Sequence, residues 1–194
     1  MFKESMSLAV KIKKNGIPSF WVNTADMQEA YSLEEKGWTK KVHWRESTVP
    51  GAGLGVFASE LIPKGTSYRI LKDEQNLIVF KGPEDIPPLT EATKSMIRNY
   101  IIQIDGLCFI MVPGSTVNHN SQGANTKVEK ISDIEVHGVA TKDIRVGEEL
   151  FCDYVEFGEP PKWLADFSKH YNIPMQFKGY NDFSNCHQFI NHSV

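Results

Sequence analysis

The sequence contains few cysteines, and they are too far apart to form a cluster. Cys108, Cys152 and Cys186 are the three among 194 residues, and no Cys-x-x-Cys pair is present. A disulfide framework favours an even set of cysteines, and a structural zinc site needs closely spaced ligands. The sequence therefore predicts neither a disulfide-stapled domain nor a metal site, and a reducing compartment is expected.

Long apolar runs and an excess of positive charge are missing as well. Residues 1–17 interleave lysines with short apolar patches, so neither a signal peptide nor a membrane span is expected there. The formal net charge of −3 gives no basic field for a nucleic-acid backbone, and a basic peptide would be a better match. With 41% hydrophobic residues, the chain can bury one good core. We expect one soluble, intracellular domain.

The hydrophobic pattern predicts short strands with a few helices between them. Helices are predicted at residues 25–36, where Gly37 would end the helix, over about three turns after the N-cap Thr90, and at 163–171. Strands are predicted at residues 38–45, 77–80, 102–104, 107–112 and 136–140. Asp105 and Gly106 supply the two left-handed residues of a tight hairpin. The proline-rich stretch 72–89 is expected to be an exposed insertion.

Three glycines alternate with other residues in the stretch 50–58, at Gly51, Gly53 and Gly55. The spacing and the lack of a following helix signal exclude a dinucleotide-binding loop. Two interpretations remain open. The glycines let the backbone approach a ligand between two strands, or they form a bulged hairpin that binds nothing.

A second pattern of apolar residues and glycine occurs twice in the chain. The copies are Ala58, Ile62 and Gly65, and then Ala140, Ile144 and Gly147 in the same spacing. Two copies are too few for a repeat architecture. They indicate two similar strand–turn–strand corners in one β core.

Two polar motifs stand out in the second half of the chain. The first is Asn118-His119, followed by Asn125, and the second, further along the chain, is Glu149-Leu150-Phe151-Cys152-Asp153-Tyr154. In this order they resemble the two signature motifs of SET-domain protein lysine methyltransferases. The resemblance covers residues 42–163. It implies a mainly β, clip-like fold of small sheets with a few helices and a knot-like crossing of the C-terminal part.

The resemblance also implies a cofactor, S-adenosylmethionine, and roles for single residues. Asn118 would contact the amino-acid end of this cofactor and His119 its adenine. The Tyr154 hydroxyl would be catalytic, because it can orient a neutral lysine amine in line with the methyl group. The remaining assignments to the cofactor pocket are Gly51, Gly53, Leu54, Gly55, Trp163 and Tyr154 itself. Cys152, Tyr100 and Phe157 would line the substrate channel.

Some family features are absent from this sequence. Ala124 stands where proline is usual, and the zinc-binding cysteines that follow the domain in many histone-directed members are missing. Trp163 and its aromatic neighbours are the expected substitute for the wall that those cysteines build. On this basis, residues 1–41 would be an extension with one helix, 42–158 the catalytic domain, and 159–194 an aromatic segment that closes the site.

The sequence thus predicts an S-adenosylmethionine-dependent protein lysine N-methyltransferase. The expected substrate is a lysine-bearing basic intracellular protein, with a histone tail as one candidate, and no direct binding to nucleic acid or membrane is expected. We expect a monomer, in the nucleus rather than the cytoplasm. The alternative is a non-catalytic SET-like module that binds other proteins, but such a module could lose Asn118 and Tyr154, and both are present.

The residue two before the catalytic tyrosine bears on how many methyl groups are added. The family often has Tyr or Phe at this position, where this chain has Cys152. A small, weakly hydrogen-bonding side chain leaves room in the channel, which predicts transfer beyond a single methyl group. The alternative is that Tyr68, Tyr100 or Phe157 restores the missing bulk.

Overall fold

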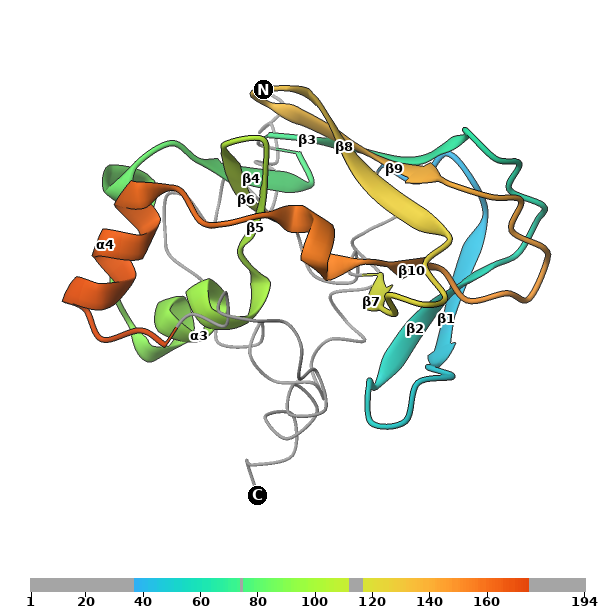
Figure 1. Cartoon of the computed structure of the whole chain (residues 1–194), viewed down its shortest axis with the longest axis horizontal. Coiled ribbons are helices and arrows are strands. Elements are labelled where there is room, and N and C mark those ends of the chain that lie inside the picture. Colours follow the sequence, from blue (N-terminus) through green and yellow to red (C-terminus); the bar gives the residue numbers. More distant parts are fainter. Residues whose placement is uncertain (1–36, 74, 112–116, 175–194) are drawn as a thin grey trace, which may run out of the picture.

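The computed structural model describes residues 37–73, 75–111 and 117–174 of the chain. Short strands dominate these ranges (Figure 1). The strands are β1 (Val42–Glu46), β2 (Leu54–Ala58), β3 (Ser67–Lys72), β4 (Leu77–Phe80), β5 (Ile102–Ile104), β6 (Leu107–Met111), β7 (Asn118–His119), β8 (Thr126–Ser132), β9 (Glu135–Ala140) and β10 (Phe151–Cys152). The helices are α3 (Glu91–Tyr100) and α4 (Lys162–His170), with 3-10 turns η2 (Pro83–Asp85) and η3 (Tyr154–Phe157). The predicted mainly β fold with few helices is confirmed.

The strands form three small sheets. β1 and β2 make an antiparallel hairpin, β3-β9-β8-β10-β7 make a five-stranded sheet, and β4-β6-β5 make a three-stranded sheet. Figure 1 shows the hairpin at one end of the molecule and α3 and α4 at the other, beside the three-stranded sheet. β10 runs parallel to both of its neighbours, β7 and β8, and so joins segments that are well separated in sequence. The knot-like crossing stays a prediction, and the predicted helix at 25–36 lies outside the described residues.

Local sequence signals account for the three-stranded sheet and its helices. The Thr90 side chain accepts a hydrogen bond from Thr93 N and so caps α3, as predicted. Asp105 and Gly106 adopt φ angles of 48° and 77° in the turn between β5 and β6, which confirms the predicted tight hairpin. The helix predicted at 163–171 is α4. Within the described ranges, no helix is long and apolar enough to cross a membrane.

The expectation of an exposed insertion at residues 72–89 was wrong for β4. Its four residues, Leu77 to Phe80, are each at most 2% exposed. Ile78 and Phe80 pack into the cluster beneath α3 and α4, whereas Leu77 and Val79 pack into a second cluster on the other face. A strand that is apolar on both faces must be covered on both, and this requirement outweighs the turn signals around it.

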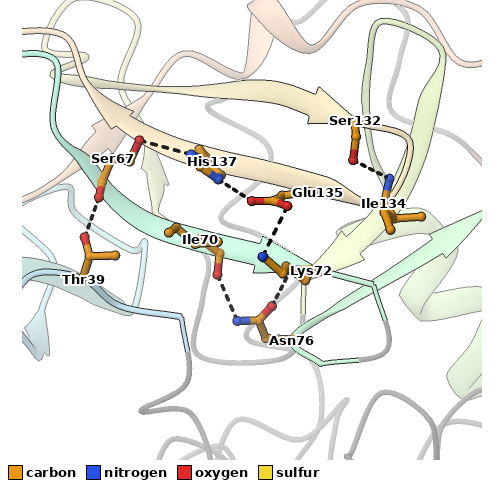
Figure 2. Close-up of polar contacts among 9 residues, drawn as sticks. All are labelled: Thr39, Ser67, Ile70, Lys72, Asn76, Ser132, Ile134, Glu135 and His137. Carbon is orange, nitrogen blue, oxygen red and sulfur yellow. Dashed lines mark hydrogen bonds and ion pairs between the residues drawn. The ribbon is translucent and has the colours of Figure 1, made fainter.

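A chain of polar side chains crosses the outer face of β3 and β9 (Figure 2). Ser67 Oγ lies 3.1 Å from His137 Nδ1, and His137 Nε2 lies 2.8 Å from Glu135 Oε1. Lys72 Nζ completes the chain at 3.4 Å from Glu135 Oε2. Asn76 then closes the turn after β3, since it accepts from Lys72 N at 2.8 Å. The half-exposed face of this sheet is thus held by cross-strand polar pairs.

The strand predicted at 38–45 is shorter in the structure and begins at Val42. Trp38 instead forms a single bridge to Arg69 of β3. Its indole ring packs against Tyr68, with centroids 5.9 Å apart, and lies beneath the Arg69 guanidinium at 4.3 Å. Aromatic and cation–π contacts with β3 therefore hold this segment, and an edge contact with Trp44 of β1, at 6.0 Å between ring centroids, keeps it beside the hairpin.

The two copies of the apolar and glycine pattern pair with each other. Ile62 and Ile144 exchange both backbone hydrogen bonds at 2.9 Å. The contacts at the ends are equivalent as well, because Gly65 N donates to Ala140 O and Gly147 N donates to Ala58 O, each at 2.8 Å. The two predicted corners are therefore the two halves of one local, nearly twofold arrangement.

Candidate active site

Parallel pairing of β7 and β10 brings the two polar motifs together. Phe151 lies opposite Asn118, and Cys152 lies opposite His119. The pairing continues beyond the strands, since Asn120 N donates to Cys152 O at 3.1 Å. Two motifs that are well separated in sequence thus become neighbours in a single ladder.

Tyr154 lies two residues after the end of β10, and both its hydroxyl and its backbone are held by hydrogen bonds. Its hydroxyl donates to Val117 O at 2.6 Å, and its backbone N–H donates to His119 Nδ1 at 3.1 Å. Burial lowers the pKa of His119 below its usual value of 6.5, against the opposing effect of the Asp153 carboxylate. A neutral His119 can accept at Nδ1 only with its proton on Nε2, so this tautomer is the one that fixes Tyr154.

A small cavity opens beside the Tyr154 ring. The cavity has room for about one water molecule. Its lining residues are Tyr68, Arg69, Leu71, Val117, Val128, Gly138, Cys152, Tyr154 and Phe157. The Phe157 ring stacks on Tyr154 with centroids 5.2 Å apart. The structure thus brings two of the predicted channel residues, Cys152 and Phe157, next to Tyr154; the side chain of the third, Tyr100, lies outside the described residues.

Tyr68 reaches the same cavity from β3 because of a β-bulge. The register of β3 against β9 shifts between Ser67 and Arg69, which turns both Tyr68 and Arg69 inward. Gly138 on β9 makes room for the phenol, since a Cβ there would lie 2.7 Å from Tyr68 Cζ. Burial raises the pKa of Tyr68 well above its usual value of 10.0, so its hydroxyl stays protonated. Tyr68 therefore fills much of the space beside the small Cys152.

Glu149 belongs to the second motif, but the sequence did not predict a role for it. Its side chain is 5% exposed and accepts hydrogen bonds from the loop between β1 and β2. Ser47 Oγ donates to Oε1 at 2.7 Å, while Thr48 donates to Oε2 from both N and Oγ1, at 2.7 and 2.6 Å. A buried carboxylate is stable only with such partners. One side chain of the second motif thus anchors the glycine-containing loop, a contact between distant parts of the sequence that motif spacing could not reveal.

Asn118 joins the same network. Its Nδ2 donates to Glu149 Oε1 at 3.2 Å and to Leu54 O at 3.1 Å. Gly55 is needed beneath this contact, because a Cβ there would lie 2.1 Å from Glu149 Oε1. β1 and β2 form the antiparallel hairpin of the second interpretation, but they pair without a register shift, so the predicted bulge is not present in their ladder. At least one of the glycines therefore makes room for a protein side chain, and a ligand near the other two stays a prediction.

Trp163 lies on α4 and packs against the core beneath the three-stranded sheet. Tyr154 and Cys152 belong to a different cluster, beside the hairpin and the five-stranded sheet. The structure therefore does not bring Trp163 into the group formed by Asn118 and Tyr154. Its predicted contact with adenine stays a prediction.

The residues around Asn118 fit a ligand with an amino-acid end. Among the described residues, none donates a hydrogen bond to Asn118 Oδ1, so this acceptor is available. Gly51 and Gly53 have φ angles of 77° and 71°, and no atom lies within 4 Å of where a Cβ of Gly53 would stand. An open acceptor and a bare stretch of backbone can receive S-adenosylmethionine. For a metal, in contrast, no group of three or more potential ligands is found in the part of the chain that the structure describes.

Comparison with known proteins agrees with this arrangement. The SET-domain family model matches residues 53–155, just over half of the chain, and the match contains both motifs. The chain belongs to the SET-domain family. Comparison with curated proteins found no match.

Two solved structures illustrate the likeness to other SET-domain proteins. A provisionally assigned histone methyltransferase from Plasmodium falciparum is 24% identical, with a TM-score of 0.45 over 60% of this chain and 94% of the other. A humanized mutant of the Chaetomium thermophilum Polycomb Repressive Complex 2 is 20% identical, with a TM-score of 0.46 over 67% of this chain. This chain spans 16% of the length of the latter. The family assignment rests on the match to residues 53–155.

Proposed function

We propose that this SET-domain protein is an S-adenosylmethionine-dependent protein lysine N-methyltransferase. The observation that carries the proposal is the position of the Tyr154 hydroxyl, fixed on Val117 O beside a small cavity and next to the β7–β10 pair. A hydroxyl held in this way can orient an amine that enters the cavity. Membership of the SET-domain family supports the same conclusion.

The cofactor site that we propose lies around Asn118, His119, Leu54 and the glycines 51 and 53. Asn118 Oδ1 would accept from the ammonium group of the ligand, and the open space at the Gly53 backbone would allow close approach. When bound, S-adenosylmethionine supplies an electrophilic methyl group on a cationic sulfonium. Gly55 supports this site indirectly, through the space it leaves for Glu149.

The protein must present a neutral amine and keep water away from it. A lysine with a pKa of about 10.4 needs roughly 4 kcal/mol to lose its proton at pH 7.4, unless its surroundings lower that pKa. The apolar walls around Tyr154, which include Val117 and Phe157, act in that direction. Burial also raises the pKa of Cys152 to about 12, so its thiol stays protonated and does not compete as a nucleophile.

The substrate that we propose is a lysine in a basic peptide segment, such as a histone tail, and the compartment is the nucleus. Acidic side chains next to Tyr154 support this choice, since the exposed Glu156 lies on η3 with it and the half-buried Asp153 precedes it. Negative charge at the mouth of a site raises the local concentration of cationic segments. We further propose that residues 42–158 form the catalytic domain of a monomer and that residues 159–194 close its site.

The full-length protein with a single substitution tests the proposal. Calorimetry should detect binding of S-adenosylmethionine to wild type and to Tyr154→Phe alike, because the ring and the cofactor residues remain. Methyl transfer to lysine peptides, followed by mass spectrometry, should fall about a hundredfold in Tyr154→Phe. The control is Ser59→Ala, which removes the exposed hydroxyl that lies 2.8 Å from His43 Nδ1, at a residue with no assigned role in the site, and should leave transfer unchanged. Cofactor binding without transfer to any basic peptide would instead favour the non-catalytic interaction module.

A further inference from the structure

The side-chain amide of Asn118 has only one orientation that its surroundings accept. Both hydrogens of Nδ2 point at acceptors, Leu54 O at 3.1 Å and Glu149 Oε1 at 3.2 Å. A backbone carbonyl and a carboxylate offer lone pairs and no proton. If the amide were flipped, its oxygen would face two other oxygens. The present orientation is therefore imposed by these two neighbours.

Glu149 is itself fixed, so it can impose this orientation. The loop between β1 and β2 holds Oε2 with the backbone N–H and the hydroxyl of Thr48, and it holds Oε1 with Ser47 Oγ. The backbone at Gly55 lies directly against the carboxylate, since a Cβ at that position would stand 2.1 Å from Oε1. With this many partners, the Glu149 carboxylate cannot shift its position if the Asn118 amide turns over.

With Nδ2 occupied by protein acceptors, Asn118 is left with one hydrogen-bonding atom for a ligand. That atom is Oδ1, which only accepts. It would attract a donor, and a charged donor most strongly, because hydrogen bonds to charged groups are the stronger ones. A ligand carboxylate, in contrast, would find no donor on this side chain.

We propose that Glu149 is a positioning residue that fixes the amide of Asn118 and thereby makes the cofactor site selective for a ligand with an ammonium group. The selectivity part rests on the function proposed above. The orientation of the amide, however, is a property of the protein without any ligand. The two parts can therefore be tested separately.

Glu149→Gln is the decisive variant. The Thr48 N–H can donate only to an oxygen, so the glutamine oxygen takes the place of Oε2 and its NH₂ group takes the place of Oε1. This NH₂ group then faces Asn118 Nδ2, and two donors oppose each other. The amide of Asn118 is released or turns over, and Oδ1 is no longer held toward the ligand. Glu148→Gln is the matched control, because Glu148 is exposed and bonds to Arg145 N instead.

Nuclear magnetic resonance of the ligand-free, full-length protein tests the orientation. The side-chain NH₂ signals of Asn118, assigned by their loss in Asn118→Ser, should exchange with solvent at least about tenfold more slowly than those of the exposed Asn172. Exchange should become fast in Glu149→Gln and stay slow in Glu148→Gln. Fast exchange in wild type would overturn the proposal, whether or not the protein binds a cofactor. The wild-type measurement also decides the matter if Glu149→Gln does not fold.

Calorimetry with two ligands tests the selectivity. Wild type should bind S-adenosylhomocysteine about 10- to 100-fold more tightly than its deaminated analogue, in which hydrogen replaces the ammonium group. The ratio should fall below about threefold in Glu149→Gln and persist in Glu148→Gln. An unchanged ratio in Glu149→Gln contradicts the selectivity role of Glu149. If the protein shows the expected ratio but transfers no methyl group, only the proposed function is contradicted. If wild type binds neither ligand, both the proposed function and the selectivity are refuted. The exchange measurement does not depend on either outcome, because it uses the ligand-free protein.

Discussion

Asn125 shows how one buried amide can take the place of a missing strand. β10 has only two residues, and the backbone just before it pairs with β2 along one edge, where Leu150 N donates to Val56 O at 2.8 Å. On the other edge, Asn125 takes the place of a strand. The Asn125 side chain donates to Glu149 O and accepts from Phe151 N, both at 2.8 Å. It thus satisfies the backbone on either side of Leu150, which is fully buried. These two hydrogen bonds help to fix the backbone at Glu149, and the Glu149 side chain in turn contacts Asn118.

Replacement of Asn125 by alanine should therefore destabilise the fold without touching the proposed chemistry directly. Glu149 O and Phe151 N would both lose their partners in a site that is 5% exposed. Each such orphaned group costs about 1–3 kcal/mol, so urea denaturation should show a loss of about 2–6 kcal/mol. Asn120→Ala is the control, because in the described part of the chain its side chain makes one loop hydrogen bond, which it accepts from Gly123 N. A loss of less than about 1 kcal/mol in Asn125→Ala would show that water replaces the amide.

At this scale the sequence predicted which residues meet but not how they bond. The Asn-His pair and the tyrosine were expected in one site. The structure places Asn118 and His119 on β7, beside β10, and Tyr154 in η3, where its backbone N–H donates to His119 Nδ1. The role of Glu149 could not be foreseen, because its partners are 31 and 101 residues away. Contacts of that kind depend on strand register and on the orientation of an amide, neither of which leaves a periodic signal.

Among the strands and helices, β3 has a large influence on the shape of the cavity, although it is a short strand. A regular strand would place Tyr68 and Arg69 on opposite faces, whereas the bulge turns both inward. Tyr68 therefore supplies an aromatic wall beside Cys152. Cys152 occupies the position, two residues before the catalytic tyrosine, at which the family often has an aromatic residue. The alternative in which another side chain restores the bulk is supported for Tyr68 and Phe157, which both line the cavity.

Tyr68 should consequently limit the number of methyl groups transferred, provided that the protein methylates lysine. Removal of its hydroxyl in Tyr68→Phe leaves the ring packed in place and enlarges the cavity by about one oxygen atom. Mass spectrometry of peptide products should then show a shift toward more highly methylated lysine. Cys152→Tyr should lose activity altogether, because the Tyr68 phenol already occupies the adjoining space. If Tyr68→Phe and wild type give the same product distribution, the limit lies elsewhere in the channel.

Elements were predictable where the signal is local. The Thr90 cap and the Asp105-Gly106 turn each act within a few residues, and both were found as expected. β4 was misjudged because the burial of its two faces depends on later parts of the chain: Leu164 of α4 packs on one face, and Val136 of β9 packs in the cluster on the other. The bulge in β3 was invisible for the same reason, since it arises from pairing with β9.

At the scale of the whole molecule, the buried residues of the described ranges form three clusters that correspond to the small sheets. One lies beneath α3 and α4, one between the hairpin and the five-stranded sheet, and one between the two larger sheets. Val128 and Phe157 pack against the last two clusters at once. The proposed active site therefore lies at a junction between sheets. Its residues come from several short segments, so no single hydrophobic periodicity in the sequence predicts their arrangement.

The paired corners link the first and last parts of this core, and the sequence predicted their likeness but not their contact. Gly65 and Gly147 end them with φ angles of 80° and 82°. No atom lies within 4 Å of where a Cβ of either glycine would stand, so alanine would meet backbone strain but no clash. The left-handed conformation costs roughly 1–2 kcal/mol for a residue with a Cβ.

Gly65→Ala and Gly147→Ala should therefore reduce stability by nearly the same amount, about 1–2 kcal/mol each, in urea denaturation. The two variants are matched controls for each other, because their glycines donate equivalent hydrogen bonds, to Ala140 O and Ala58 O. An equal loss is expected although the corners are far apart in sequence, since both hold the same Ile62–Ile144 pairing. If one variant were neutral and the other unfolded the protein, the corners would be alike only in shape, and one of them alone would support the core.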